Sequence, residues 1–227
     1  MIFRIKALLN RCFFWVSILL FTAFTPNPIL SSSLSDAENL EFKEAVKAVK
    51  SKNYGLAIQI FEKHASNARH DAQYNLAVLL QAGKGRPRNY QETLFWAWQA
   101  QLGGIEEAKD IADDMVSLLP AEVTDKTRDR VQQALQKRVD RGDISAIPQL
   151  GLFFVTIPEE KDYLNSYIWY SIGRALDIPE TESARDNAEA ELEPKDLVEA
   201  QTKTLDLFDK FKLHAVNPQN QGNRNEN

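Results

Sequence analysis

Few side chains in this sequence have the type and spacing that metal chemistry requires. The histidines are His64, His70 and His214. Zinc sites on helices use two histidines at i and i+4, as in H-E-x-x-H, and no pair here has that spacing. We therefore interpret all three as surface histidines and predict no metal site.

The acidic pairs of the sequence do not favour acid–base catalysis either. They are Glu106-Glu107, Asp113-Asp114 and Glu159-Glu160. Neighbouring side chains on a helix point apart, whereas a catalytic carboxylate pair must converge in a cleft. The sequence contains no nucleophile elbow, phosphate loop or dinucleotide fingerprint, and its one cysteine, Cys12, begins an apolar run near the N-terminus. We predict no catalytic residue and no cofactor.

One group of side chains suggests binding rather than catalysis. Phe95, Trp98 and Leu102 are spaced as i, i+3 and i+7, so they share one face of a helix. Buried aromatic residues dominate the energetics of many protein interfaces, and we hypothesise that these three form a protein-binding patch. The alternative is that a later amphipathic helix over 122–139 folds back and covers them, because large exposed apolar patches are uncommon on monomers.

The elements that carry this patch are a pair of helices over residues 70–102. Apolar and small residues recur with a helical period from Ala72 to Leu80, and Gly83 and Gly85 then end the helix. Asn89 is a favourable N-cap for the second helix, with Glu92 in capping-box spacing. Sustained alternation of apolar and polar residues is missing, so we expect no β-sheet.

This pair resembles the Sel-one-like repeat family, a branch of the tetratricopeptide-type helical repeats. The matching residues are Ala72, Tyr74, Leu76, Gly83, Gly85, Tyr90, Leu94, Trp96, Ala100, Gly103 and Ala108. Ala77 and Thr93 depart from the family pattern, which usually has Gly and Ala there. The resemblance implies an all-α fold, a right-handed α-solenoid of antiparallel helix pairs, and a role in binding proteins rather than in catalysis.

A second, degenerate copy of a unit of about 74 residues follows the first. We predict an N-terminal capping helix pair over 36–69, repeat unit one over 70–142 and repeat unit two over 143–216, each unit with extra helices. The internal Pro148 predicts a kinked or shortened helix. The residues expected to stack the units are Leu76, Ala77, Gly83, Gly85, Tyr90, Trp96 and Ala100 in the first and Leu150, Gly151, Tyr163, Trp169 and Tyr170 in the second.

The two ends of the chain differ from this repeat region. Residues 1–35 predict a signal peptide or N-terminal anchor, because Arg4, Lys6 and Arg11 precede the apolar run Cys12–Phe24. Thirteen residues are short for a membrane span, which needs about 20. Residues 217–227 are rich in Asn and Gln and predict a disordered tail.

Together these features predict an exported, non-catalytic interaction module or regulator in the bacterial cell envelope. The net charge of −5 argues against a nucleic-acid partner, so we expect another protein, periplasmic or membrane-embedded. We expect a periplasmic location, with an inner-membrane anchor as the alternative and an uncleaved N-terminus as the only membrane contact. An envelope hydrolase of unknown substrate and a membrane-tethered assembly factor remain alternative functions.

Overall fold

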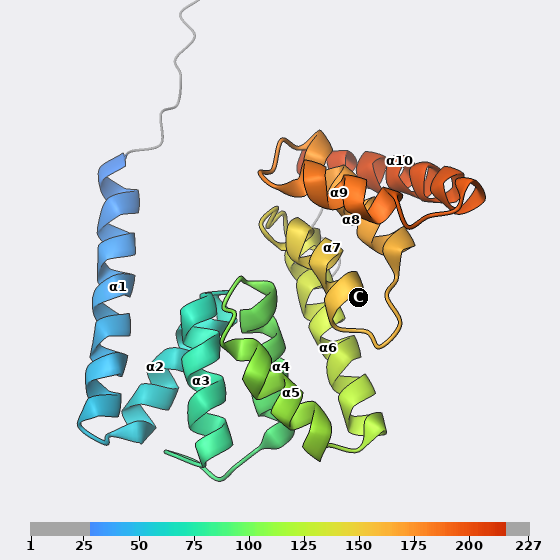
Figure 1. Ribbon diagram of the computed structural model, residues 1–227. Coiled ribbons are helices and arrows are strands. Elements are labelled where there is room, and N and C mark those ends of the chain that lie inside the picture. The colour runs from blue at the N-terminus through green and yellow to red at the C-terminus, as the bar shows by residue number, and fades with distance from the viewer. Residues whose placement is uncertain (1–27, 217–227) are drawn as a thin grey trace, which may run out of the picture. The chain divides into compact units, whose positions relative to one another are not determined.

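The computed structural model describes residues 28–216, and the side chains of 36–210. This part of the chain contains ten helices and no strand, which confirms the all-α prediction (Figure 1). The helices are α1 Pro28–Lys50, α2 Tyr54–Ser66, α3 His70–Ala82, α4 Tyr90–Leu102, α5 Ala108–Leu118, α6 Ala121–Asp140, α7 Ala146–Thr156, α8 Tyr163–Ala175, α9 Thr181–Glu189 and α10 Pro194–Val216.

Two compact units divide the chain, residues 1–38 and 39–227, and α2–α10 lie entirely within the second. Residues 1–27, which hold most of the predicted signal or anchor, and the whole predicted tail over 217–227 lie outside the described residues. α1 begins at Pro28, so this helix crosses the boundary that we predicted after residue 35.

Polar side chains and a glycine fix the helix ends of the first repeat. The Asn89 side chain accepts a hydrogen bond from the backbone N–H of Glu92 at 3.1 Å, as an N-cap should. Only this half of the predicted capping box forms, because the Glu92 carboxylate pairs with Arg130 of α6 instead. Gly83 ends α3 in the left-handed conformation, with φ of 66°, where a residue without Cβ meets no steric penalty.

The helices pack on their neighbours in chain order, which makes the array an α-solenoid. α2 contacts α3, α3 contacts α4, and α4 is covered by α5 and α6. α6 then contacts α7, which begins a second series in which α8 contacts α7, α9 and α10. Each helix therefore depends on close neighbours, as expected for a repeat array. The right-handed sense of the solenoid stays a prediction.

Two apolar cores lie within this array. The first joins α1, α2 and α3 around Phe61, and the second extends from Ala77 of α3 to α10. Trp96 is partly buried and packs against both cores. It therefore links the capping helices to the rest of the solenoid, which agrees with the stacking role expected for it.

The order and contacts of α3–α6 recur in α7–α10. α4 begins at Tyr90 and α8 at Tyr163, 73 residues later, and the same interval separates α5 from α9 and α6 from α10. In both series the second helix contacts the other three. This recurrence supports the division at residues 142 and 143, which stays a proposal.

Pro148 lies in the first turn of α7 and leaves the helix intact. α7 begins at Ala146, so Pro148 is its third residue, where a backbone N–H has no partner within the helix. The missing N–H of proline therefore costs little there. α7 has eleven residues where α3 has thirteen, but Pro148 in its first turn does not account for the shorter length.

Candidate protein-binding surface

The three residues predicted to bind a partner are buried. Phe95, Trp98 and Leu102 expose 6%, 5% and 3% of their surface, so they form no exposed patch. The hypothesis of a protein-binding patch at these positions is therefore corrected. Their burial against other helices accounts for the second apolar stripe on α4.

α6 packs against α4, as the alternative interpretation required. Val131, Leu135 and Val139 of α6 belong to the same core as the α4 residues. The guanidinium of Arg130 lies 3.8 Å from the centre of the Phe95 ring, a cation–π contact. Arg130 also pairs with Glu92, so the same side chain fastens α6 to α4 twice.

The histidines do not behave alike. His64 is buried, which makes the surface interpretation wrong for this residue, and its Nε2 lies 3.3 Å from a Glu41 carboxylate oxygen. His70 is half-buried, and the side chain of His214 lies outside the described residues. Among the residues that the structure describes, no group of three or more His, Cys, Asp or Glu could hold a metal ion.

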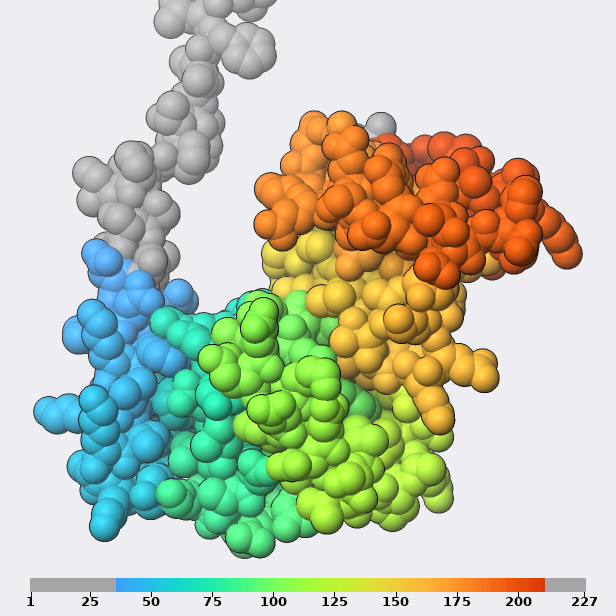
Figure 2. Space-filling view, in the orientation of Figure 1, coloured from blue at the N-terminus to red at the C-terminus, as the bar shows by residue number. Residues whose placement is uncertain are grey.

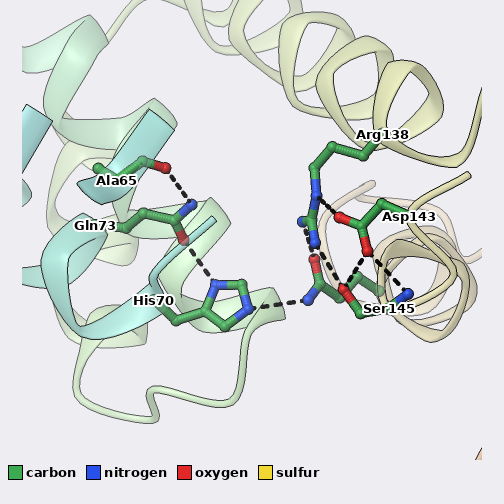
Figure 3. Close-up of polar contacts among 7 residues, drawn as sticks. Ala65, His70, Gln73, Arg138, Asp143 and Ser145 are labelled. Atoms are coloured by element: carbon green, nitrogen blue, oxygen red, sulfur yellow. Dashed lines mark hydrogen bonds and ion pairs between the residues drawn. The ribbon is translucent and has the colours of Figure 1, made fainter. Parts of the chain in front are cut away.

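His70 takes part in a chain of polar contacts that joins α3 to α7 (Figure 3). Gln73 donates from Nε2 to the carbonyl oxygen of Ala65 at 3.1 Å, which leaves its Oε1 to accept from His70 Nδ1 at 2.9 Å. His70 Nε2 lies 3.0 Å from Gln149 Nε2, which donates to it. These roles place the imidazole proton on Nδ1.

The chain of contacts continues from Gln149 into the turn between α6 and α7 (Figure 3). Arg138 donates to Gln149 Oε1 at 2.7 Å and to Asp143 Oδ2 at 2.8 Å. Ser145 donates its hydroxyl to Asp143 Oδ1 at 2.6 Å. Burial raises the pKa of Asp143, but the hydrogen bonds from Ser145 and Arg138 and the Arg138 charge outweigh it, so the net pKa is lowered.

We name the residues from Gln73 to Ser145 in this chain the polar junction: Gln73, His70, Gln149, Arg138, Asp143 and Ser145. It contains serine, histidine and aspartate but lacks the order of a nucleophilic triad. Ser145 hydrogen-bonds directly to Asp143, whereas Gln149 and Arg138 lie between His70 and that pair. His70 is therefore not placed to take the proton of this hydroxyl, as the histidine of a triad would be. The polar junction holds α3, α6 and α7 together.

A hollow between α3 and α5 offers an accessible surface for a partner. Its volume is about 420 Å³. The residues that line it are Gln81, Arg88, Tyr90, Asp114, Met115, Ser117 and Leu118. The green surface of α5 adjoins the teal surface of α3 in Figure 2, and contacts between the two helices bring these walls together. We refer to this feature as the α3–α5 hollow.

The α3–α5 hollow combines an apolar edge with opposite charges. Leu118 is 60% exposed at the end of α5, while Arg88 and Asp114 supply a cation and an anion. Gln81 donates to Asp114 at 3.5 Å, and Arg88 to the Tyr90 hydroxyl at 3.5 Å, so the polar walls are only loosely held. Such a mixture suits a protein partner, because interfaces pair apolar anchors with a polar rim.

A second hollow, of about 470 Å³, lies between α1 and α2. Leu40, Ala48 and Leu56 form its apolar part, and Lys43 and Lys47 its basic part. It belongs to the capping helices, whereas the α3–α5 hollow lies between the first helices of two successive pairs. The sequence signal that could have found the latter is the end of α5, Met115 to Leu118, where Leu118 lies beyond the buried stripe.

Comparisons with known proteins give partial likenesses. No family model matches the chain. A mouse protein named DAP3-binding cell death enhancer 1 is 26% identical over 122 residues, which is 53% of this chain and 24% of that protein. The chain thus spans about a quarter of this relative's length. Within the described residues, none of the helices is both long and apolar enough to span a membrane.

Among solved structures, the chain is similar to a protective antigen of uropathogenic Escherichia coli strains that displays an SLR fold. The identity is 18%, the match covers 88% of this chain and 52% of the other, and the TM-score is 0.34. A likeness at that level carries no inference about this chain. The helices and their contacts themselves establish an all-α helical-repeat architecture.

Proposed function

We propose that this protein is an exported, non-catalytic interaction module of the bacterial cell envelope, related to the Sel-one-like repeats. It binds a periplasmic or membrane-embedded protein through the α3–α5 hollow. The observation that carries the proposal is Leu118, which is 60% exposed at the edge of a hollow that also presents Arg88 and Asp114.

The architecture supports a binding role. Helices that each contact only close neighbours leave long stretches of surface free, and repeat proteins use such surfaces for recognition. The mouse relative is named for binding DAP3, and its match covers about half of this chain. That name supports protein binding as a class of function, and we take from it neither the partner nor the activity.

The N-terminal sequence supports export. Arg4, Lys6 and Arg11 are followed by a mostly apolar run of thirteen residues, the order found in secretory signals. Cell fractionation and sequencing of the mature N-terminus test this part of the proposal. A periplasmic protein that begins near Ser35 is expected, and a full-length protein in the cytosolic fraction would contradict it.

The binding surface is tested by affinity capture from envelope extract with two charged variants. Leu118→Asp places a carboxylate at the hollow, whereas Val116→Asp is two residues away on another face of α5 and serves as the matched control. We expect a specific protein that is retained by the wild type and the control and lost by Leu118→Asp. Equal retention by all three would contradict the proposed site, provided that circular dichroism shows equal helicity.

A further inference from the structure

α10 carries an exposed apolar face at the C-terminal end of the described solenoid. Val198 and Leu205 expose 63% and 66% of their surface. They are seven residues apart, which places them on the same side of the helix, two turns from each other. The opposite side of α10, with Ala200 and Leu207, packs into the core.

Stacking within the repeat does not require these two apolar residues. α6 is the counterpart of α10, and its buried Thr124 and Thr127 correspond to Leu197 and Ala200, 73 residues later. At the same interval, Asp125 and Gln132 of α6 correspond to Val198 and Leu205. Both α6 residues are polar and exposed, so unit one leaves this face to solvent. Stacking within the repeat therefore does not explain the apolar pair on α10.

The residues between and beside the pair make the face suitable for another helix. Thr202 lies between them, and its hydroxyl donates to the Val198 carbonyl oxygen at 2.9 Å, which satisfies it within α10. Lys195 lies one turn before Val198, and Asp209 lies one turn after Leu205, both exposed. The face thus has an apolar centre, a basic end and an acidic end.

We propose that this face binds the same face of a second copy of the chain, with the two α10 helices antiparallel about a two-fold axis near Thr202. Val198 then lies against Leu205 of the second copy, and Lys195 against its Asp209. A two-fold axis repeats both contacts, as in isologous dimers. Parallel pairing would place Lys195 against Lys195 and Asp209 against Asp209. The charges of the face therefore complement a reversed copy of itself.

The size of the face determines the strength of the dimer. A standard interface buries about 800 Å² on each partner, more than a few residues of one helix supply. The pairing is accordingly reversible and depends on concentration. It does not use the α3–α5 hollow, so it stands or falls independently of the proposed function.

Sedimentation of the purified full chain over a wide concentration range provides the first test. The wild type and Val116→Asp are expected to shift from monomer to dimer, while Leu205→Asp raises the dissociation constant by roughly tenfold or more, because each dimer loses two buried leucines. A wild type that stays monomeric at every concentration overturns the proposal. A dimer that Leu205→Asp leaves unchanged also overturns it, because contacts elsewhere then hold the copies together.

Charge exchange tests the antiparallel arrangement. Lys195→Asp and Asp209→Lys alone each create two like-charge contacts per dimer and are expected to weaken it several-fold. The double variant Lys195→Asp/Asp209→Lys restores opposite charges and is expected to recover the wild-type dissociation constant. This pairing is overturned if the dimer of the double variant is weakened by as much as the effects of the two single variants combined. These residues lie on the surface of one helix, so the variants leave the fold intact and circular dichroism can verify it.

Discussion

Repeat unit one, α3–α6, and unit two, α7–α10, follow one plan with different side chains at corresponding contacts. Between their first and second helices, unit one places Ala77 on α3 and Ala97 on α4, both fully buried. Unit two has Gly151 and Tyr170 at the corresponding positions, and a Cβ on Gly151 would lie 2.9 Å from the Tyr170 ring. The space between these two helices therefore holds two small side chains in unit one, whereas in unit two it holds a glycine and a large aromatic side chain. The plan of the two units is thus shared while the residues at corresponding contacts are not.

The units also differ in what covers their last helix. α6 packs on α7 of the next unit, whereas α10 presents Val198 and Leu205 to solvent. Asp125 and Gln132, the α6 counterparts of this apolar pair, are exposed as well, so the two units differ here in the polarity of the side chains and not in their exposure.

The largest effect is expected where unit one buries an aromatic residue that unit two lacks. Trp98→Ala should lower the free energy of unfolding by about 3–5 kcal/mol, the range for losing a large buried aromatic side chain. Its counterpart Ser171 has a buried hydroxyl that the structure leaves without a hydrogen-bond partner. Ser171→Ala should therefore change stability by less than about 1 kcal/mol, and in the stabilising direction. Urea unfolding of both variants checks this contrast, and similar losses would contradict it.

A glycine at the end of α4 gives the next effect. A Cβ on Gly103 would overlap the His70 ring, so Gly103→Ala should cost about 1–3 kcal/mol, as overpacking does. In a His70→Ala background the same substitution should cost much less, because the ring is gone. Unit two carries Leu176 at the corresponding helix end. A double-mutant cycle by thermal unfolding measures the coupling, and additive losses would show that Gly103 and His70 do not contact.

Gly151→Ala tests the compensating pair of unit two. The added methyl group meets the Tyr170 ring at 2.9 Å, and a loss of about 1–2 kcal/mol is expected. The double variant Gly151→Ala/Tyr170→Ala has two alanines at these positions, as unit one has. In the Tyr170→Ala background, the added methyl group should therefore be neutral or stabilising. Chemical denaturation of the wild type, the two single variants and the double variant shows whether the methyl group lowers or raises the free energy of unfolding in each background. A Gly151→Ala cost that is equal in both backgrounds would contradict the idea of compensation.

The smallest effect concerns pH. The pKa of Asp143 is lowered in the folded protein from 3.8, its ordinary value, so its contribution to stability is present above that value and is lost as pH falls through the folded pKa. Asp143→Asn lacks this contribution. The difference in urea midpoint between wild type and Asp143→Asn should therefore shrink as the pH is lowered from about 5 towards about 3. A difference that grows in acid would reverse the assigned sign.

Much of the fold follows from local sequence signals. The predicted N-cap at Asn89 and the glycine end of α3 at Gly83 both appear in the structure, and the helix predicted over 122–139 is α6. These features depend on residues close in sequence, for which spacing and conformational preference are sufficient. The position of Pro148 shows the limit, because its effect depended on where α7 begins.

The candidate site was harder to predict, because it depends on long-range packing. Periodicity showed that Phe95 and Trp98 share an apolar face, yet it could not show whether α6 or a partner covers that face. Burial of His64 and the contact of His70 with Gln149, 79 residues away, have no local signature. The α3–α5 hollow likewise arises only when α5 packs beside α3.

Photo-crosslinking in living cells tests the central claim most directly, that the α3–α5 hollow binds a protein. A photoreactive residue at Ser117 lines the hollow, and one at the adjacent Val116 lies outside it. We predict one discrete crosslinked protein from position 117 and none from position 116. Equal crosslinking from both positions, or none from 117 while the chain remains folded in the envelope, would contradict the account.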